Sequence, residues 1–112
     1  MRYRVQARLK PDAGNVLYVK LTDGSVEQQK PDGREILASM RRAVVQDDGM
    51  IVWNETCYCT PPLRHERETV YDSFFVEMST ESVAEDAAEP AGPLFWTRLQ
   101  HDHGKTVSPK EP

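Results

Sequence analysis

RYRVQARLK, at residues 2–10, alternates polar and apolar side chains along its whole length. Side chains two residues apart point to the same face of a β-strand, so this period predicts an amphipathic strand. Its apolar face carries Tyr3, Val5, Ala7 and Leu9, and the opposite face is mainly basic. A strand with one apolar face predicts a sheet that packs on helices on one side. Pro11 ends the strand.

Residues 12–29 fit two local structures. Asp12 is suited to cap a helix over Ala13–Thr22, with Gly24 as its stop signal. The same segment also resembles a hairpin that turns at residues 23–24. We favour the helix, because the second arm of such a hairpin would be residues 26–29, which are poor in strand formers.

The segments 34–46 and 50–59 are predicted to form a hairpin. Asp47-Asp48-Gly49 suits a three-residue loop with Gly49 in the left-handed region. This register places Arg41 opposite Glu55 and Ala43 opposite Trp53. Apolar side chains fall on both faces of residues 36–45, a pattern typical of a strand that is buried on both sides. One face would then pack on helices and the other on a second subunit.

A helix is predicted over about residues 61–77, because Thr60-Pro61 is a common helix start and apolar side chains follow at helical spacing. Residues 79–83 are expected to form a short last strand. The resulting order of strands and helices predicts an α+β domain over residues 1–83. Its expected architecture is a ferredoxin-like βαββαβ two-layer sandwich, an antiparallel sheet with helices on one face.

The rest of the chain divides by composition. Residues 84–93 are small, acidic and contain proline, so they are predicted to be a linker or mobile loop. Residues 94–104 begin with an apolar cluster that should dock on the domain as a short helix or strand, since exposure of its large side chains is unfavourable. Residues 105–112 are expected to be a disordered tail.

Cys57, Cys59 and His65 are the residue types that bind zinc, and His101 or His103 would complete a set of four. Structural zinc sites usually separate paired cysteines by two residues or more, within a turn that wraps the ion. Because the two cysteines are one residue apart on a predicted strand, we expect no metal and no cofactor. Two thiols without a disulfide are typical of a reducing compartment, so the cytoplasm is the expected location.

Four residues are the candidates for a sheet-lined small-molecule site: Arg41, Trp53, Glu55 and His65. Nucleic acid is not an expected partner, because the basic strand face lacks aromatic residues and the sequence pI is about 5.3. A membrane is excluded as well, since no apolar run approaches the roughly 20 residues that a spanning helix needs.

No motif in the 112 residues identifies a reaction or a ligand. We favour a small soluble binding or interaction module that acts as a homodimer, because this function requires no chemistry that the sequence does not display. The alternatives are a small-molecule enzyme with a sheet-lined pocket, and a zinc or thiol protein that uses Cys57 and Cys59.

Overall fold

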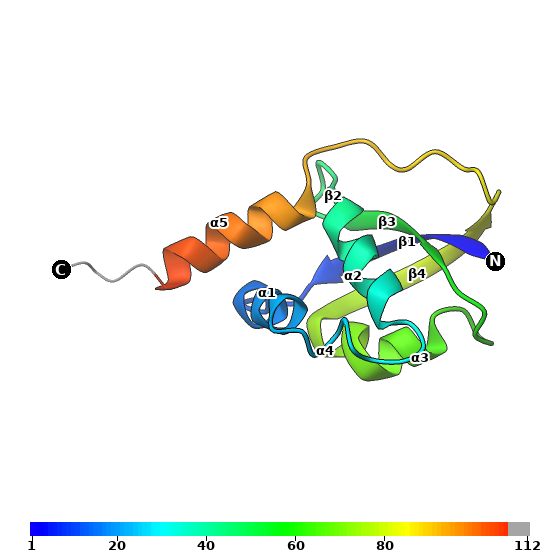
Figure 1. The fold of residues 1–112 in the computed structure, drawn as a ribbon. Coiled ribbons are helices and arrows are strands. Elements are labelled where there is room, and N and C mark those ends of the chain that lie inside the picture. The colour runs from blue at the N-terminus through cyan, green and yellow to red at the C-terminus, as the bar shows by residue number, and fades with distance from the viewer. Residues whose placement is uncertain (108–112) are drawn as a thin grey trace.

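The computed structural model describes the backbone of residues 1–107 and the side chains of residues 1–102. The described part is an α+β structure with one four-stranded antiparallel sheet and four helices, the third of which is continuous over residues 64–74 (Figure 1). The elements in chain order are β1 (Arg2–Leu9), α1 (Gly14–Thr22), α2 (Gly33–Arg42), β2 (Val44–Val45), β3 (Ile51–Thr56), α3 (Arg64–Glu66), the π-helical turn η1 (Arg67–Tyr71), α4 (Asp72–Phe74), β4 (Phe75–Val83) and α5 (Phe95–Val107).

The strand order is β2-β3-β1-β4, and every neighbouring pair is antiparallel. The predicted amphipathic strand at residues 2–10 is confirmed as β1, which lies between β3 and β4. Val5 lies opposite Trp53 and both are fully buried, whereas Gln6 on the other face is exposed. The period-two pattern therefore separates a core face from a polar face, as expected for a half-buried strand.

The helix predicted over residues 13–22 is confirmed as α1, and the alternative hairpin is wrong. Leu17 and Leu21, four residues apart, are both buried in the core. The predicted cap is wrong in one detail, because Ala13 occupies the cap position and Asp12 precedes it with a φ of 62°.

The predicted strand at residues 34–46 is wrong over most of its length, because residues 33–42 form α2. The buried positions are Gly33, Ile36, Ser39 and Met40, and their spacing is that of one helical face. Glu35, Ala38, Met40 and the arginines of this segment are also good helix formers. Apolar residues on both faces of an assumed strand were in fact one face of a helix.

Only Val44 and Val45 keep the predicted hairpin register, opposite Val52 and Ile51. Gly49 in the loop has a φ of 87°, so its left-handed conformation is confirmed. The pairings of Arg41 with Glu55 and of Ala43 with Trp53 are wrong, because Arg41 belongs to α2 and β2 begins only after Ala43.

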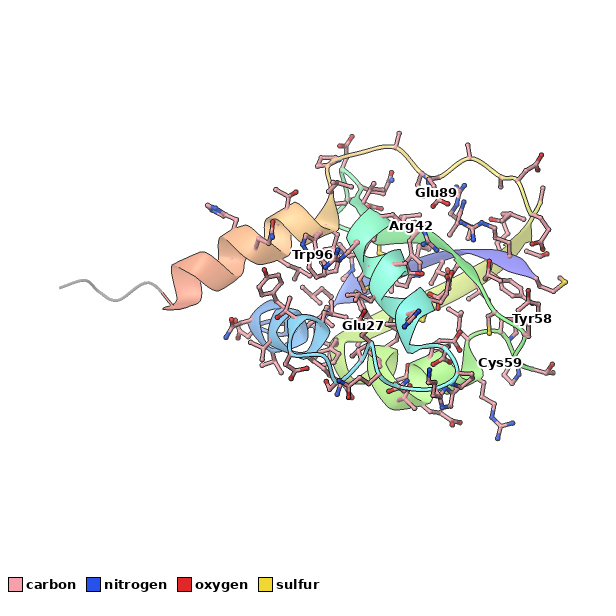
Figure 2. The ribbon with its side chains drawn as sticks, in the orientation of Figure 1. Glu27, Arg42, Tyr58, Cys59, Glu89 and Trp96 are labelled. Atoms are coloured by element: carbon pink, nitrogen blue, oxygen red, sulfur yellow. The ribbon has the colours of Figure 1, made fainter. Side chains whose placement is uncertain are left out.

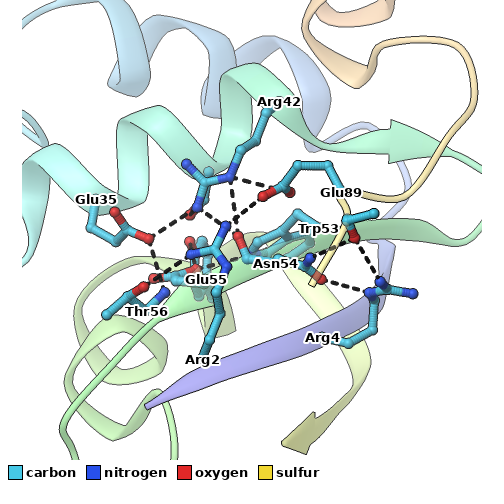
Figure 3. Close-up of polar contacts among 12 residues, drawn as sticks. Arg2, Arg4, Glu35, Arg42, Trp53, Asn54, Glu55, Thr56 and Glu89 are labelled. Atoms are coloured by element: carbon cyan, nitrogen blue, oxygen red, sulfur yellow. Dashed lines mark hydrogen bonds and ion pairs between the residues drawn. The ribbon is translucent and has the colours of Figure 1, made fainter. Parts of the chain in front are cut away.

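Side chains of α2 bind the edge of β3 that the short β2 leaves open (Figure 3). The Arg42 guanidinium donates to the backbone oxygen of Asn54 at 2.6 and 3.1 Å. The backbone N–H of Thr56 donates to Glu35 Oε2 at 2.9 Å, and Glu35 and Arg42 form an ion pair at 3.0 Å. An unpaired strand edge invites pairing with another chain, and these contacts cover part of that edge.

The helix predicted over residues 61–77 is shorter at both ends. It begins at Arg64, after Leu63 in the left-handed region with a φ of 62°, and the chain leaves it at Phe75 to form β4. The predicted last strand at residues 79–83 is therefore confirmed but starts four residues earlier. Residues 75–78 are extended rather than helical because this part of the chain pairs with β1, with Phe75 opposite Leu9.

Residues 84–94 connect β4 to α5. They contain no helix or strand, apart from a single β-bridge between Leu94 and Val44. The segment passes the polar face of β1, where Arg4 and Asn54 both donate to the backbone oxygen of Ala88. Glu89 forms ion pairs with Arg2 and Arg42 (Figure 3).

The apolar cluster at residues 94–99 belongs to a helix, α5, which settles the choice between helix and strand. Its Phe95 and Leu99 side chains are buried in the core, while Leu94 stays half exposed. The tail predicted at residues 105–112 overlaps the end of α5 at residues 105–107, and residues 108–112 lie outside the described residues. None of the helices in the described part is both long enough and apolar enough to cross a membrane.

Candidate thiol–carboxylate site

Cys57 and Cys59 lie just beyond the end of β3, in a loop that turns around the first of them. The backbone N–H groups of Cys59 and Leu63 donate to the Cys57 sulfur at 3.1 and 3.3 Å. Our expectation of two thiols on a strand, with no turn around them, is therefore wrong. β3 ends at Thr56, and Pro61 and Pro62, which lack backbone N–H groups, do not favour a return to the ladder after this loop.

Glu66 of α3 brings a carboxylate to the two thiols. Its side chain is buried, and its Oε1 lies 3.6 Å from Cys57 Sγ and 3.5 Å from Cys59 Sγ. One ligand atom from each of these three residues lies within 4.8 Å of the others. We call Cys57, Cys59 and Glu66 the thiol–carboxylate cluster.

The surroundings of Cys57 keep its thiol protonated. Burial raises its pKa to about 12, because the charged thiolate loses its hydration, although the N–H donors of Cys59 and Leu63 act in the opposite direction. A protonated thiol can donate to the Glu66 carboxylate. A bound metal ion would replace that proton, since coordination deprotonates a thiol outright.

The cluster forms part of the wall of a pocket of about 420 Å³. The wall presents mostly carbon and sulfur atoms, and it is made by Pro31, Asp32, Glu35, Thr56, Cys57, Tyr58, Cys59 and Glu66. Tyr58 is largely exposed, and Figure 2 shows it with Cys59 at the end of the molecule opposite to α5. His101 on that helix therefore lies away from the cluster, and the side chain of His103 is outside the described side chains.

The four residues predicted to bind a small molecule do not lie together in one site. The guanidinium of Arg41 lies 5.0 Å from the ring centre of Trp96, between α2 and α5. Trp53 and Glu55 are buried in the core, whereas His65 is partly exposed and contacts Asp32. The prediction assumed a strand at residues 34–46, and with α2 in its place the shared face does not exist.

Glu55 is instead the acceptor of a buried hydrogen-bond network. Trp53 Nε1 and the Tyr71 hydroxyl donate to its Oε1 at 2.8 and 2.6 Å, while its Oε2 is buried without a partner. Burial raises the pKa of Glu55 to about 8, and the nearby Glu66 and Glu35 act in the same direction. The side chain is therefore a neutral acid at neutral pH, with Oε1 as its carbonyl oxygen.

His65 Nδ1 lies 2.7 Å from Asp32 Oδ2, and Asp32 in turn lines the pocket. This hydrogen bond raises the pKa of His65 above its usual value of 6.5. We expect the Asp32→Asn substitution to lower the pKa of His65, because the amide no longer stabilises the imidazolium. Titration of the His65 ring signals by NMR, in metal-free protein, measures the change. An identical His65 pKa in both proteins would show that Asp32 does not control it.

Sequence reasoning missed Glu66 and Asp32. Glu66 shares a helical face with Leu63, Val70 and Phe74, all of which are buried. An acid at apolar spacing is unusual, because a carboxylate is rarely buried without a partner. That signal stands in the sequence at residue 66, inside the polar run 65–68.

The chain was also compared with known proteins. No family model, no curated protein and no solved structure matches it.

Proposed function

We propose that the protein binds a soft divalent metal ion, of which zinc is the type case, through the thiol–carboxylate cluster. The observation that carries the proposal is the convergence of three ligand atoms, from two separate segments, within 4.8 Å of one another. Thiolate and carboxylate are both established zinc ligands, and paired thiolates favour zinc over hard ions such as magnesium.

The burial of Glu66 supports the proposal. A carboxylate that is removed from water is costly unless a cation or several donors compensate it. Glu66 is 1% exposed, and its hydrogen-bond partners in the described part of the chain are the two thiols. No ion pair of Glu66 with a basic residue occurs among the described residues. A divalent ion would supply the missing positive charge.

The hydrogen bonds to Cys57 are a second support. Backbone N–H groups that point at a sulfur stabilise it best when it carries negative charge, as a metal-bound thiolate does. The sequence argument against a metal rested on a strand with no turn. The turn at residues 57–63 removes that objection, because it brings Leu63 and the following helix back to Cys57.

Cobalt binding provides the direct test. Chelator-treated protein is titrated with Co²⁺, and thiolate-to-cobalt charge-transfer absorption is followed. We expect one ion per chain, and competition with Zn²⁺ should abolish the signal. The variant with both Cys57→Ser and Cys59→Ser should lose the absorption, and Glu66→Gln should weaken binding by about tenfold or more.

Glu68→Gln is the matched control for Glu66→Gln, because Glu68 lies on the exposed side of the same helix in an ion pair with Arg64. Its cobalt affinity should equal that of the wild type. Cobalt binding that survives the loss of both thiols would contradict the proposal, as would a wild-type protein that binds no ion at micromolar concentrations.

The broader architecture is compatible with the ferredoxin-like arrangement, which we also propose. Its support is that the β2–β3 hairpin lies on one side of β1 and β4 on the other, with all pairs antiparallel. Two features depart from the simple βαββαβ order: two helices precede β2, and α5 follows β4.

A binding module that forms a homodimer in the cytoplasm remains a proposal. A reducing compartment would keep Cys57 and Cys59 available for the ion. The predicted two-sided burial of residues 36–45 no longer supports a dimer, since residues 36–42 belong to helix α2. The free edge of β4, which pairs on one side only, is now the better candidate for contact with a second copy.

Sedimentation velocity at micromolar concentration should show a species of twice 12.8 kDa, and a monomer alone would exclude this proposal.

A further inference from the structure

The thiol–carboxylate cluster leaves one coordination position of a tetrahedral ion open. Three ligand residues are grouped in the described part of the chain, and zinc is generally four-coordinate. The three residues also line the 420 Å³ pocket, so the open position would face it. Sites with three protein ligands and an accessible fourth position bind water or an external ligand. The inference below rests on the proposed metal binding.

The charge of the pocket disfavours an anionic fourth ligand. Two thiolates and a carboxylate carry three negative charges against two positive charges on the ion. Asp32 and Glu35 also line the pocket, and no Lys or Arg is among its lining residues. His65 contacts Asp32 and Arg42 contacts Glu35, so these two basic residues offset the charge of the acids. Neither basic residue is part of the pocket wall. A neutral donor therefore suits the open position better than an anion.

The pocket wall favours a flat apolar ligand. Carbon and sulfur atoms make up most of its surface, and Pro31 and Tyr58 contribute apolar side chains. Tyr58 is 85% exposed, so its ring offers a free face at the rim. Aromatic rings gain from stacking in addition to the burial of their surface. A volume of about 420 Å³ is in the range of pockets that hold one small molecule.

We propose that the metal-bearing pocket binds a small neutral nitrogen heterocycle, with its ring nitrogen on the ion and its ring plane against Tyr58. A neutral aromatic nitrogen satisfies the charge of the cluster, and the rest of the ring occupies the apolar wall. No covalent bond of the ligand is made or broken in this step. The ligand replaces the water that otherwise completes the coordination of the ion.

Cobalt-loaded protein is the probe, titrated separately with imidazole, benzimidazole and azide. We expect both heterocycles to shift the visible cobalt spectrum with a stoichiometry of one per ion. Benzimidazole should bind about tenfold more tightly than imidazole, because its second ring buries additional apolar surface. Azide, a small anion, should bind more weakly than imidazole.

Two variants test the role of the rim. Tyr58→Ala should weaken benzimidazole binding to the cobalt-loaded protein about tenfold, with a smaller effect on imidazole. Val16→Ala is the matched control, since Val16 is an exposed apolar residue on α1 and is not part of the pocket wall. It should leave both affinities unchanged.

The possible failures are distinct. A protein that binds no cobalt overturns the proposed function and this inference together. Cobalt binding with a spectrum that neither heterocycle moves overturns this inference alone. Azide binding tighter than imidazole, or benzimidazole binding that is unaffected by Tyr58→Ala, also overturns it, because the charge or the ring contact would then not select the ligand.

Discussion

Glu55→Gln is expected to stabilise the metal-free protein at neutral and alkaline pH and to flatten its stability profile between about pH 4.5 and 8. Glu55 is fully buried, and burial raises its pKa from 4.5 to about 8. The unfolded chain therefore loses this proton near pH 4.5, whereas the folded protein keeps it up to about pH 8. The folded state binds more protons across this interval.

The sign follows from proton linkage. Stability falls with rising pH wherever the folded state binds more protons than the unfolded state. The contribution of Glu55 is thus fully present below about pH 4.5 and is lost progressively up to about pH 8. At pH 7 the loss is on the order of 3 kcal/mol, since each unit of pKa difference corresponds to about 1.4 kcal/mol.

Glutamine has no proton to lose, and its side-chain oxygen can still accept from Trp53 and Tyr71. Its amide N–H groups take the place of Oε2, which has no partner. We therefore expect the substitution to give no gain in stability at pH 4. Urea unfolding from pH 4 to 9, with chelator present, measures the difference. Glu68→Gln, on an exposed ion pair, should keep the wild-type profile. A variant that is less stable than the wild type at pH 8 would contradict the raised pKa.

Leu99→Ala is expected to destabilise the protein by about 3 kcal/mol, within the range of roughly 2–5 kcal/mol typical of buried leucines. Leu99 is 1% exposed in the core, where α5 packs on α1. Its Cδ2 lies 3.4 Å from the position that a Cβ on Gly14 would take, so the two helices approach closely there. Truncation of the isobutyl side chain to a methyl group leaves a cavity that these helices cannot close without moving.

Leu94→Ala is the matched control, because Leu94 is 48% exposed and directly precedes α5. Its effect should stay within about 0.5 kcal/mol, as for most surface substitutions. Thermal or urea unfolding of both variants decides the question. Equal small effects would mean that α5 is not an integral part of the folded unit.

Local sequence pattern was sufficient to predict the elements whose side chains repeat with one clear period. Residues 2–10 alternate without a break, so the strand and its buried face could be predicted together. Gly49 and Gly24 marked their turns because a left-handed backbone is strained for other residues, and both glycines have positive φ. The docking of Phe95 and Leu99 was predictable from the cost of leaving them in water, whereas the choice between helix and strand for their segment was not.

The helical conformation of residues 33–42 depends on contacts with distant parts of the chain. Their apolar side chains fit one helical face as well as two strand faces, so local pattern could not distinguish the two. Packing did: as a helix, α2 buries Ile36 and Met40, and it also brings Glu35 and Arg42 to the free edge of β3. Those contacts are separated along the chain and have no local signature.

The candidate site was decided by tertiary structure for the same reason. Cys57 and Cys59 were visible as potential ligands, but the third ligand depends on how the loop at residues 57–63 returns the chain to the sheet. This return places Glu66 beside the thiols and turns His65 away toward Asp32. Sequence fixes which groups exist, whereas the distance between groups nine residues apart depends on a turn whose geometry is set by the packing of Leu63 and Val70 in the core.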